Sequence, residues 1–207
     1  MPPRATVEKA VRPGRGRRPA SEVRQAVLEA AARLLYDEGL RAVTFERVAA
    51  AAGASKVTLY KWWSTPAVLA FEAYHADVMP GLAFPDTGDF QTDLRTQLHS
   101  FARAMMERPG SGARTRGQVI AEIVGAAHGD ATLADAFHEY YTTPRRELTQ
   151  RMFRLARERG QIPAHLDLPA LADQLWGACY HKLMMFGEPL DDGYIDALIA
   201  NLFGRTD

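Results

Sequence analysis

The stretch TFERVAAAAGASKVTLYKWWSTPAVLAFEAY, residues 44–74, decides the fold of this chain. Thr44 is placed to cap a short amphipathic helix over residues 45–52. Gly53 follows at a point where a sharp turn needs a residue that tolerates left-handed backbone geometry. Ser55 is placed to cap a second short helix. Two short helices joined by a glycine-containing turn are typical of a helix-turn-helix motif.

The second helix of the motif, residues 55–62, has one inward face and one outward face. Leu59 and the following Trp63 are expected to point inward. Val57 and Thr58 lie near its N-terminus and are slender. A helix that is narrow at this end can enter the major groove of a DNA duplex.

Helical spacing of apolar residues recurs through the rest of the chain, and no stretch shows the alternation of a β-strand. The sequence therefore predicts an all-α protein. Before the motif we expect a helix from about residue 22 to 38, with Ser21 as its N-cap and Gly39 at its C-terminal end. Pro144 is expected to kink or divide one long helix. Further helices are expected at 66–80, 89–107, 113–127, 131–159, 168–186 and 192–203.

Composition excludes several classes of protein. The chain has 207 residues, of which 47% are apolar, so it can bury a sizeable core. Cys179 is the single cysteine, which excludes an internal disulfide and a thiolate zinc cage. No apolar run approaches the roughly 18 residues that span a bilayer, and the N-terminus has no apolar signal segment. We therefore expect a soluble cytoplasmic protein with no membrane partner.

Charge is divided unequally along the chain although the formal net charge is zero. Residues 1–63 carry 12 Lys/Arg against 6 Asp/Glu, and residues 64–207 carry 13 against 19. Such a split suggests a polyanion-binding segment joined to a second domain. Residues 1–20 are the most basic and are interrupted by prolines and glycines, which predicts a flexible basic arm. A solubilising tail or an imprecise start site is the alternative.

The motif and its surroundings resemble the TetR family of transcriptional regulators. The matching residues near the N-terminus are VRQAVLEAAARLLYDEGLRAVTFERVAAAAG at 23–53 and ASKVTLYKWW at 54–63. The second part of the chain is similar to one subgroup of that family. Its matching segments are PDTGDF at 85–90, TPRREL at 143–148 and FGEPLDDGYIDALIANLFG at 186–204. The resemblance implies a three-helix DNA-binding domain at 21–64 and a helical ligand-binding and dimerisation domain at 65–207, after the arm at 1–20.

The resemblance also implies which residues meet DNA. The second helix of the motif would lie in the major groove, where Lys56 can reach guanine O6 and N7. Val57 and the methyl group of Thr58 can pack on a thymine methyl. Thr44 and the helix N-terminus that it caps would face a phosphate. The residues implied at the DNA are Arg17, Arg18, Thr44, Arg47, Ser55, Lys56, Val57, Thr58, Tyr60, Lys61, Trp62 and Thr65.

Three points of this assignment stay open. Pro66 departs from the family, which often has a phosphate-contacting lysine there, so Thr65 or the basic arm would have to substitute. Arginines of the arm, Arg17 and Arg18 among them, could reach an A·T-rich minor groove. Trp62 could contact the DNA backbone or serve in packing only.

The resemblance implies a homodimer that is built by the last two helices. The helix at 168–186 has two apolar rows, and one of them could face a partner chain while the other faces its own domain. An ordinary buried core helix is the alternative. The residues expected at the dimer interface are Leu175, Cys179, Leu183, Ile195, Leu198, Ile199 and Leu202.

An effector pocket for an apolar small molecule is expected by the same resemblance. Mixed methionine and aromatic linings suit adaptable binding of such molecules. The same residues at helical spacing could simply form core. The residues expected to line the pocket are Phe71, Tyr74, His75, Phe101, Met105, Phe137, Tyr141, Trp176, Tyr180 and Met184.

Other functions find little support in the sequence. It contains no HExxH, P-loop, GxSxG or CxxC motif, so we expect no catalytic residue, no metal site and no cofactor. Asp135 and His138 are one helical turn apart, which more often reflects a solvated pair than a metal site. A non-specific architectural DNA-binding protein and a helical ligand-binding module without operator function are the alternatives. The favoured interpretation is a ligand-responsive repressor that binds a palindromic operator.

Overall fold

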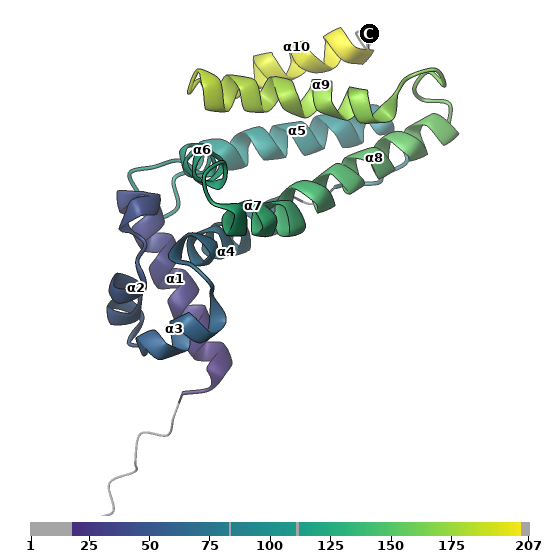
Figure 1. Cartoon of the computed structure of the whole chain (residues 1–207). Coiled ribbons are helices and arrows are strands. Elements are labelled where there is room, and N and C mark those ends of the chain that lie inside the picture. The colour runs from purple at the N-terminus through teal and green to yellow at the C-terminus, as the bar shows by residue number, and fades with distance from the viewer. Residues whose placement is uncertain (1–17, 83, 111, 204–207) are drawn as a thin grey trace, which may run out of the picture.

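The computed structural model describes residues 18–82, 84–110 and 112–203 (Figure 1). Within these ranges the chain is helical with no β-strand, so the prediction of an all-α fold is confirmed. The α-helices are α1 (Ala20–Glu38), α2 (Phe45–Ala52), α3 (Lys56–Trp62), α4 (Pro66–Val78), α5 (Phe90–Met106), α6 (Arg116–Ala127), α7 (Ala131–Phe137), α8 (Thr143–Glu158), α9 (Leu168–Tyr180) and α10 (Asp192–Phe203).

The helices form two groups that share one core. Helices α1, α2 and α3 gather at one end of the molecule, and the long helices α5, α8, α9 and α10 run side by side at the other (Figure 1). Helix α4 lies between the groups and packs closely on α1, α6 and α7. One cluster of buried apolar side chains extends from Val27 in α1 to Ile199 in α10. The helix-turn-helix is therefore packed against the rest of the chain through α1 and α4.

The ends of the motif helices follow from capping side chains. Thr44 Oγ1 accepts a hydrogen bond from Arg47 N at 3.2 Å, and Ser55 Oγ accepts one from Thr58 N at 3.1 Å. Gly53 adopts the left-handed conformation, with φ 60° and ψ 38°. These sequence predictions are confirmed.

The predicted cap of the first helix is wrong. Helix α1 begins at Ala20, one residue before Ser21, and Pro19 is its N-cap without a side-chain hydrogen bond. A proline just before a helix loses nothing by its missing N–H, because the first amides of a helix have no partner within it.

The long helix expected at 131–159 is interrupted. A π-helical turn, η3 (His138–Thr142), separates α7 from α8. Pro144 in the first turn of α8 explains the irregularity, because proline has no N–H to donate and its ring crowds the preceding turn. The helix expected at 168–186 likewise passes at its end into a π-helical turn, η4 (His181–Met185).

Two further helices, α4 and α6, have boundaries that differ from the expected ones. Helix α4 ends at Val78, and a single 3₁₀ turn, η2 (Met79–Gly81), follows it. Helix α6 begins at Arg116, later than expected, because Thr115 caps it in a reciprocal capping box with Gln118. Among the described residues, no helix has the length and apolar character that a bilayer crossing would need.

Gly39 lies between α1 and α2, close to Glu122 of α6. It has φ 93° and ψ 176°, and the 3₁₀ turn η1 (Leu40–Ala42) follows it. A Cβ at this position would lie 2.9 Å from Glu122 Oε2 and 3.1 Å from the Arg114 guanidinium. Gly39 thus allows the loop after α1 to approach α6 closely, where Leu40 N donates to Glu122 Oε2 at 2.9 Å.

We expect Gly39→Ala to lower the free energy of unfolding by about 1–3 kcal/mol, because its backbone conformation is nearly exclusive to glycine. Gly125→Ala is the matched control. That glycine lies within α6 with open space around it, so alanine should be neutral or stabilising by up to about 1 kcal/mol. Urea denaturation of both variants makes the comparison. Equal stability of the two variants would contradict the strain assigned to Gly39.

Candidate DNA interface and effector pocket

Helix α3 presents an exposed face at the outer end of the molecule. Val57 is 78% exposed and Tyr60 is 62% exposed, which is unusual for large apolar side chains. On the opposite face Leu59 is fully buried and anchors the helix in the core. The ring of Tyr60 packs edge-on against Phe45 of α2, with 4.7 Å between ring centroids. The helix therefore offers a supported but uncovered surface.

The cations around this surface are mostly paired within the chain. Lys56 Nζ lies 2.9 Å from Glu46 Oε1. Arg47 donates to both oxygens of Glu38, at 2.6 and 2.9 Å. These hydrogen bonds lower the pKa of Glu46 and of Glu38. Lys61 is exposed and forms no ion pair with any residue that the structure describes.

The hydroxyl groups of three helix caps can also bind phosphate. Thr44, Ser55 and Thr65 each accept a hydrogen bond from an amide of the helix that they begin. A hydroxyl that accepts a bond can still donate its own proton. Each cap can therefore donate to a phosphate oxygen without losing its structural role.

Arg18 has a structural role that the sequence did not indicate. Its guanidinium donates to the carbonyl oxygens of Ala52 and Gly53, at 3.1 and 2.8 Å. These carbonyls lie at the C-terminal end of α2, where arginine side chains commonly satisfy free acceptors. Arg18 thus stabilises the turn of the motif, while Arg17 lies outside the described residues.

Trp62 and Trp63 form part of the joint between α1, α3 and α4. Trp63 is buried, and its Nε1 donates to Glu72 Oε2 at 2.7 Å. The Arg24 guanidinium lies 4.8 Å from the centre of the Trp63 ring and 2.5 Å from Glu72 Oε1. Trp62 is partly buried and packs edge-on against Trp63. Packing is therefore an established role of Trp62.

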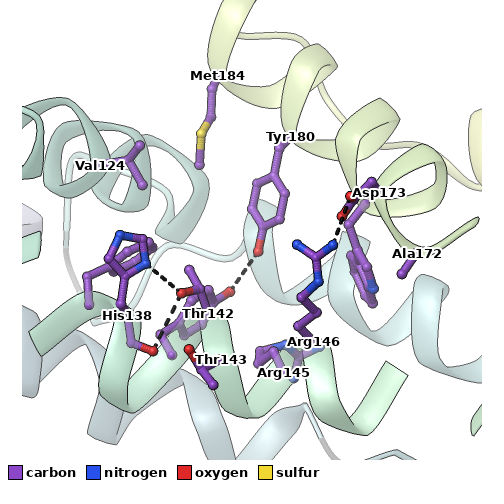
Figure 2. Close-up of a pocket in the computed structure, with 13 residues that line it drawn as sticks. Val124, His138, Thr142, Thr143, Arg145, Arg146, Ala172, Asp173, Tyr180 and Met184 are labelled. Atoms are coloured by element: carbon purple, nitrogen blue, oxygen red, sulfur yellow. Dashed lines mark hydrogen bonds and ion pairs between the residues drawn. The ribbon is translucent and has the colours of Figure 1, made fainter. Parts of the chain in front are cut away.

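A cavity of about 520 Å³ lies in the other group of helices (Figure 2). One wall comes from the end of α7, from η3 and from the start of α8. The other comes from α9 and η4. The structure places five of the ten expected pocket residues at this cavity. They are Phe137, Tyr141, Trp176, Tyr180 and Met184.

The other five expected pocket residues lie elsewhere. Phe71, Tyr74, Phe101 and Met105 are buried in the core, where Tyr74 donates to the sulfur of Met105 at 3.8 Å. His75 is half-buried on α4, and burial lowers its pKa. Their helical spacing therefore reflects core packing at these positions.

The sequence does not indicate the polar lining residues, because their role depends on the π-helical turn and on the meeting of two helices. His138 Nδ1 and Thr142 Oγ1 lie 2.9 Å apart, and Arg146 Nη2 lies 2.9 Å from Asp173 Oδ2 (Figure 2). The lining residues that sequence reasoning did not identify are Val124, His138, Thr142, Thr143, Arg145, Arg146, Ala172 and Asp173.

Two tyrosines bridge the walls of the cavity. The hydroxyl oxygens of Tyr141 and Tyr180 are 3.0 Å apart, and Tyr180 points across the cavity from α9 (Figure 2). Burial raises the pKa of both phenols. Both hydroxyls are therefore protonated near neutral pH. Since a pair needs only one of its two protons for the mutual bond, the second can be donated elsewhere.

Arg145 places a buried positive charge in the cavity wall. Its side chain is 6% exposed, and its guanidinium donates to Leu82 O at 3.0 Å. The same group lies 4.9 Å from the ring centre of Phe84 and 5.4 Å from that of Trp176. Aromatic faces attract cations, so these contacts help to offset the cost of burying the charge.

A chain of contacts joins the cavity to α3. Phe137 in the cavity wall packs edge-on against Phe71 of α4, with 5.5 Å between ring centroids. The next residue on α4 is Glu72, which binds Arg24 and Trp63. Helix α4 thus contacts the cavity wall through one residue and the helix-turn-helix through its neighbour.

A second joint links α4 to α6. Asp77 of α4 accepts hydrogen bonds from the Tyr36 hydroxyl at 2.8 Å and from Arg116 Nε at 2.8 Å. Arg116 also pairs with Glu107. Burial and the bond to Asp77 raise the pKa of Tyr36 far above its usual range. This half-buried network fixes α1, α4 and α6 relative to one another.

Comparison with known proteins identifies the family. The profile of bacterial regulatory proteins of the tetR family matches residues 27–73. The profile described as a tetracyclin repressor-like C-terminal domain matches residues 84–202, more than half of the chain. The chain belongs to the TetR family. It is therefore a DNA-binding transcriptional regulator and not an enzyme.

Relatives of this TetR-family chain match along nearly its whole length. The uncharacterized HTH-type transcriptional regulator YdeS of Bacillus subtilis is 31% identical, over 91% of this chain and 92% of its own. The DNA-binding transcriptional repressor TetR of Mycobacteroides abscessus is 29% identical, over 86% and 90%. The crystal structure of the TetR family regulator SCO0332 is 46% identical and has a TM-score of 0.72. That match covers 90% of this chain and 100% of SCO0332.

The residues expected at the TetR-type dimer interface need correction. Leu175, Cys179, Leu183, Ile195 and Ile199 are buried within the single chain, so they are not available to a partner chain. Burial raises the pKa of the Cys179 thiol to about 12. Leu198 and Leu202 are partly exposed. The exposed residues of α9 and α10 instead include the small and polar side chains Ala170, Gln174, Gly177, Gly193, Asp196 and Ala197.

We expect Glu46→Gln to tighten binding to random duplex DNA by about three- to tenfold and to steepen its salt dependence. The substitution frees Lys56 from its ion pair and removes a negative charge from the surface that would face phosphates. Fluorescence anisotropy at several salt concentrations measures both effects. Glu158→Gln, at the remote end of α8, is the control of equal charge. Weaker binding by Glu46→Gln would instead show that the carboxylate positions Lys56 for the DNA.

Proposed function

We propose that this chain is a ligand-responsive repressor that binds a palindromic operator as a homodimer in the cytoplasm. The observation that carries the proposal is the exposed face of α3, where large apolar and cationic side chains lie uncovered on a helix that Leu59 anchors in the core. Uncovered surfaces of this kind mark binding sites. The relative from Mycobacteroides abscessus, which is described as a repressor, supports the direction of regulation.

Contacts with the operator divide into two kinds. Lys56, Val57 and Thr58 read bases in the major groove, since they lie in the first turn of α3. Tyr60 and Lys61 bind phosphates and orient the helix. The remaining phosphate contacts come from the other residues expected at the DNA, which are Arg17, Arg18, Thr44, Arg47, Ser55, Trp62 and Thr65.

The two parts of the chain have different functions. Residues 21–64 form the DNA-binding domain, and residues 65–207 bind the effector and dimerise. Because two half-sites lie one DNA turn apart, the two α3 helices must stay about 34 Å apart to bind together. A ligand at the cavity would move Phe137 and so shift Phe71 and Glu72 on α4, which changes this spacing.

Sequencing of the genomic fragments that co-purify with the protein tests the proposal. We expect one palindromic sequence, bound at least about a thousandfold more tightly than random duplex DNA. Thr58→Ala should cost about 1–3 kcal/mol on that sequence and less on scrambled DNA, because it removes a base contact. Lys61→Ala should weaken binding to both and reduce the salt slope by roughly one. Equal affinity for all duplexes would favour an architectural DNA-binding protein instead.

Dimerisation would use the outward faces of α9 and α10. We expect Gly177→Arg to yield folded monomers with lost operator affinity, because a long charged side chain would prevent close packing of two α9 helices. Gly177 has open space around it in the single chain, so the fold itself should tolerate the change. Gly125→Arg, at an equally open helical glycine of α6, is the control.

Sedimentation velocity at micromolar concentration separates the outcomes of the dimer test. The wild type and Gly125→Arg should sediment as dimers, and Gly177→Arg as a monomer. A monomeric wild type would refute the proposed dimer. A dimeric Gly177→Arg would place the interface on another face of the molecule.

A further inference from the structure

The charged side chains that line the cavity between α8 and α9 are held by other groups of the chain. Arg146 pairs with Asp173 at 2.9 Å, and both side chains are exposed, so this pair lies at the rim. Arg145 is buried in the wall, where it donates to Leu82 O and lies over the ring of Trp176. Neither arginine is therefore a free cation, and recognition of a ligand depends on the uncharged groups of the lining.

The uncharged interior is formed mainly by aromatic rings that are fixed in place. Phe137 and Tyr141 have nearly parallel rings, with an interplanar angle of 25° and centroids 5.3 Å apart. The indole Nε1 of Trp176 donates to Thr149 Oγ1 at 2.9 Å, and Phe101 packs edge-on against the same ring with 5.0 Å between centroids. Preformed aromatic walls favour a flat ligand, because little side-chain freedom is lost on binding.

Tyr141 and Tyr180 provide a spare hydrogen-bond donor within this interior. Their hydroxyl oxygens are 3.0 Å apart, and neither hydroxyl has another hydrogen-bond partner among the residues that the structure describes (Figure 2). Burial raises the pKa of both phenols, so the pair carries two protons and uses only one of them for the mutual bond. A ligand that fills the cavity excludes water from the second proton. A buried donor without an acceptor is costly, so such a ligand has to supply the acceptor itself.

Irregular helix geometry positions both members of the tyrosine pair. Tyr141 lies in the π-helical turn η3, and Tyr180 directly precedes the π-helical turn η4. Such turns are rare and recur at functional sites. Since each wall contributes one hydroxyl from beside such a turn, the pair is better explained as part of a binding site than as a consequence of core packing.

We propose that the cavity binds a flat, uncharged aromatic molecule whose carbonyl oxygen accepts a hydrogen bond from the Tyr141–Tyr180 pair, such as an aryl ketone. The rings of the ligand would lie among Phe137, Tyr141 and Trp176. An ionised group would lose its hydration in the aromatic interior, which is costly. This inference rests on the proposed ligand response but concerns only the chemistry of the ligand, so it can be tested without DNA.

Equilibrium dialysis of the wild-type protein compares three naphthalenes of nearly identical shape. Acetylnaphthalene carries the carbonyl oxygen, isopropenylnaphthalene has a methylene group in place of that oxygen, and naphthoate carries an anionic group at the same position. We expect the ketone to bind at least about tenfold more tightly than naphthoate, because only naphthoate brings a charge into the cavity. Equal or tighter binding of naphthoate, or no binding of the ketone, would overturn the proposal.

A double variant tests the hydrogen bond itself. Tyr141→Phe combined with Tyr180→Phe removes both hydroxyls and keeps both rings, since either hydroxyl alone can still donate to a ligand. We expect the ratio of ketone affinity to alkene affinity to fall at least about tenfold, because only the ketone loses a hydrogen bond. Tyr194→Phe is the control, because it removes a hydroxyl that donates to Ala178 O outside the cavity lining. An unchanged ratio in the double variant, or an equal fall in the control, would refute the assignment.

The carbonyl stretching band of the bound ketone gives a second measurement that needs no variant. A hydrogen bond from a tyrosine hydroxyl weakens the C=O bond, so the infrared band of acetylnaphthalene bound to the wild type should lie at lower frequency than in an alkane solvent. A band at the alkane frequency would overturn the proposal.

Release of operator DNA is a separate readout. A ketone that binds the protein but leaves the operator complex intact would count against the proposed ligand response and not against the specificity of the cavity. Failure of the ketone to bind, with intact operator binding, would overturn the specificity and leave the DNA-binding function standing.

Discussion

Two carboxylates on α4 hold the parts of this molecule together. Glu72 binds Arg24 of α1 and the indole of Trp63. Asp77 binds Tyr36 of α1 and Arg116 of α6. Both carboxylates are half-buried, and a charge in such a place is costly unless it is paired. Movement of α4 that broke either network would therefore be opposed, and Glu72 joins α4 to Trp63 at the end of the helix-turn-helix.

On the surface of α3, ion pairs within the chain orient cationic side chains before DNA is bound. Lys56 and Arg47 rest on Glu46 and Glu38, so their long side chains are already oriented. These pairs are exposed and hence weak, and DNA phosphates can replace the carboxylates. Lys61 is uncovered, whereas Arg18 is bound to the turn after α2. Neighbouring cations thus have different structural roles. All of them contribute to the basic character of the first part of the chain.

The cavity between α8 and α9 depends on irregular helix geometry. If α7 continued as a regular α-helix in place of η3, the side chains of Tyr141 and Thr142 would point in other directions. The bond between Tyr141 and Tyr180 then joins walls that are 39 residues apart in the sequence. The contact of Phe137 with Phe71 connects this cavity to α4, so the same few aromatic residues line the site and support the joint.

Local signals in the sequence determined the helices, the helix-turn-helix and the family, because caps such as Thr44 and Ser55, and the left-handed Gly53, act on residues a few positions away. They could not determine which apolar residues face a cavity, a partner or the core. Phe101 and Trp176 are both large aromatic residues on predicted helices, yet one is buried in the core and the other lines the cavity. Leu175 and Ile195 were expected at a dimer interface and are buried in the single chain. Those outcomes depend on how separate helices meet, and only the tertiary structure decides that, because burial is a property of the assembled helices and not of the spacing within one of them.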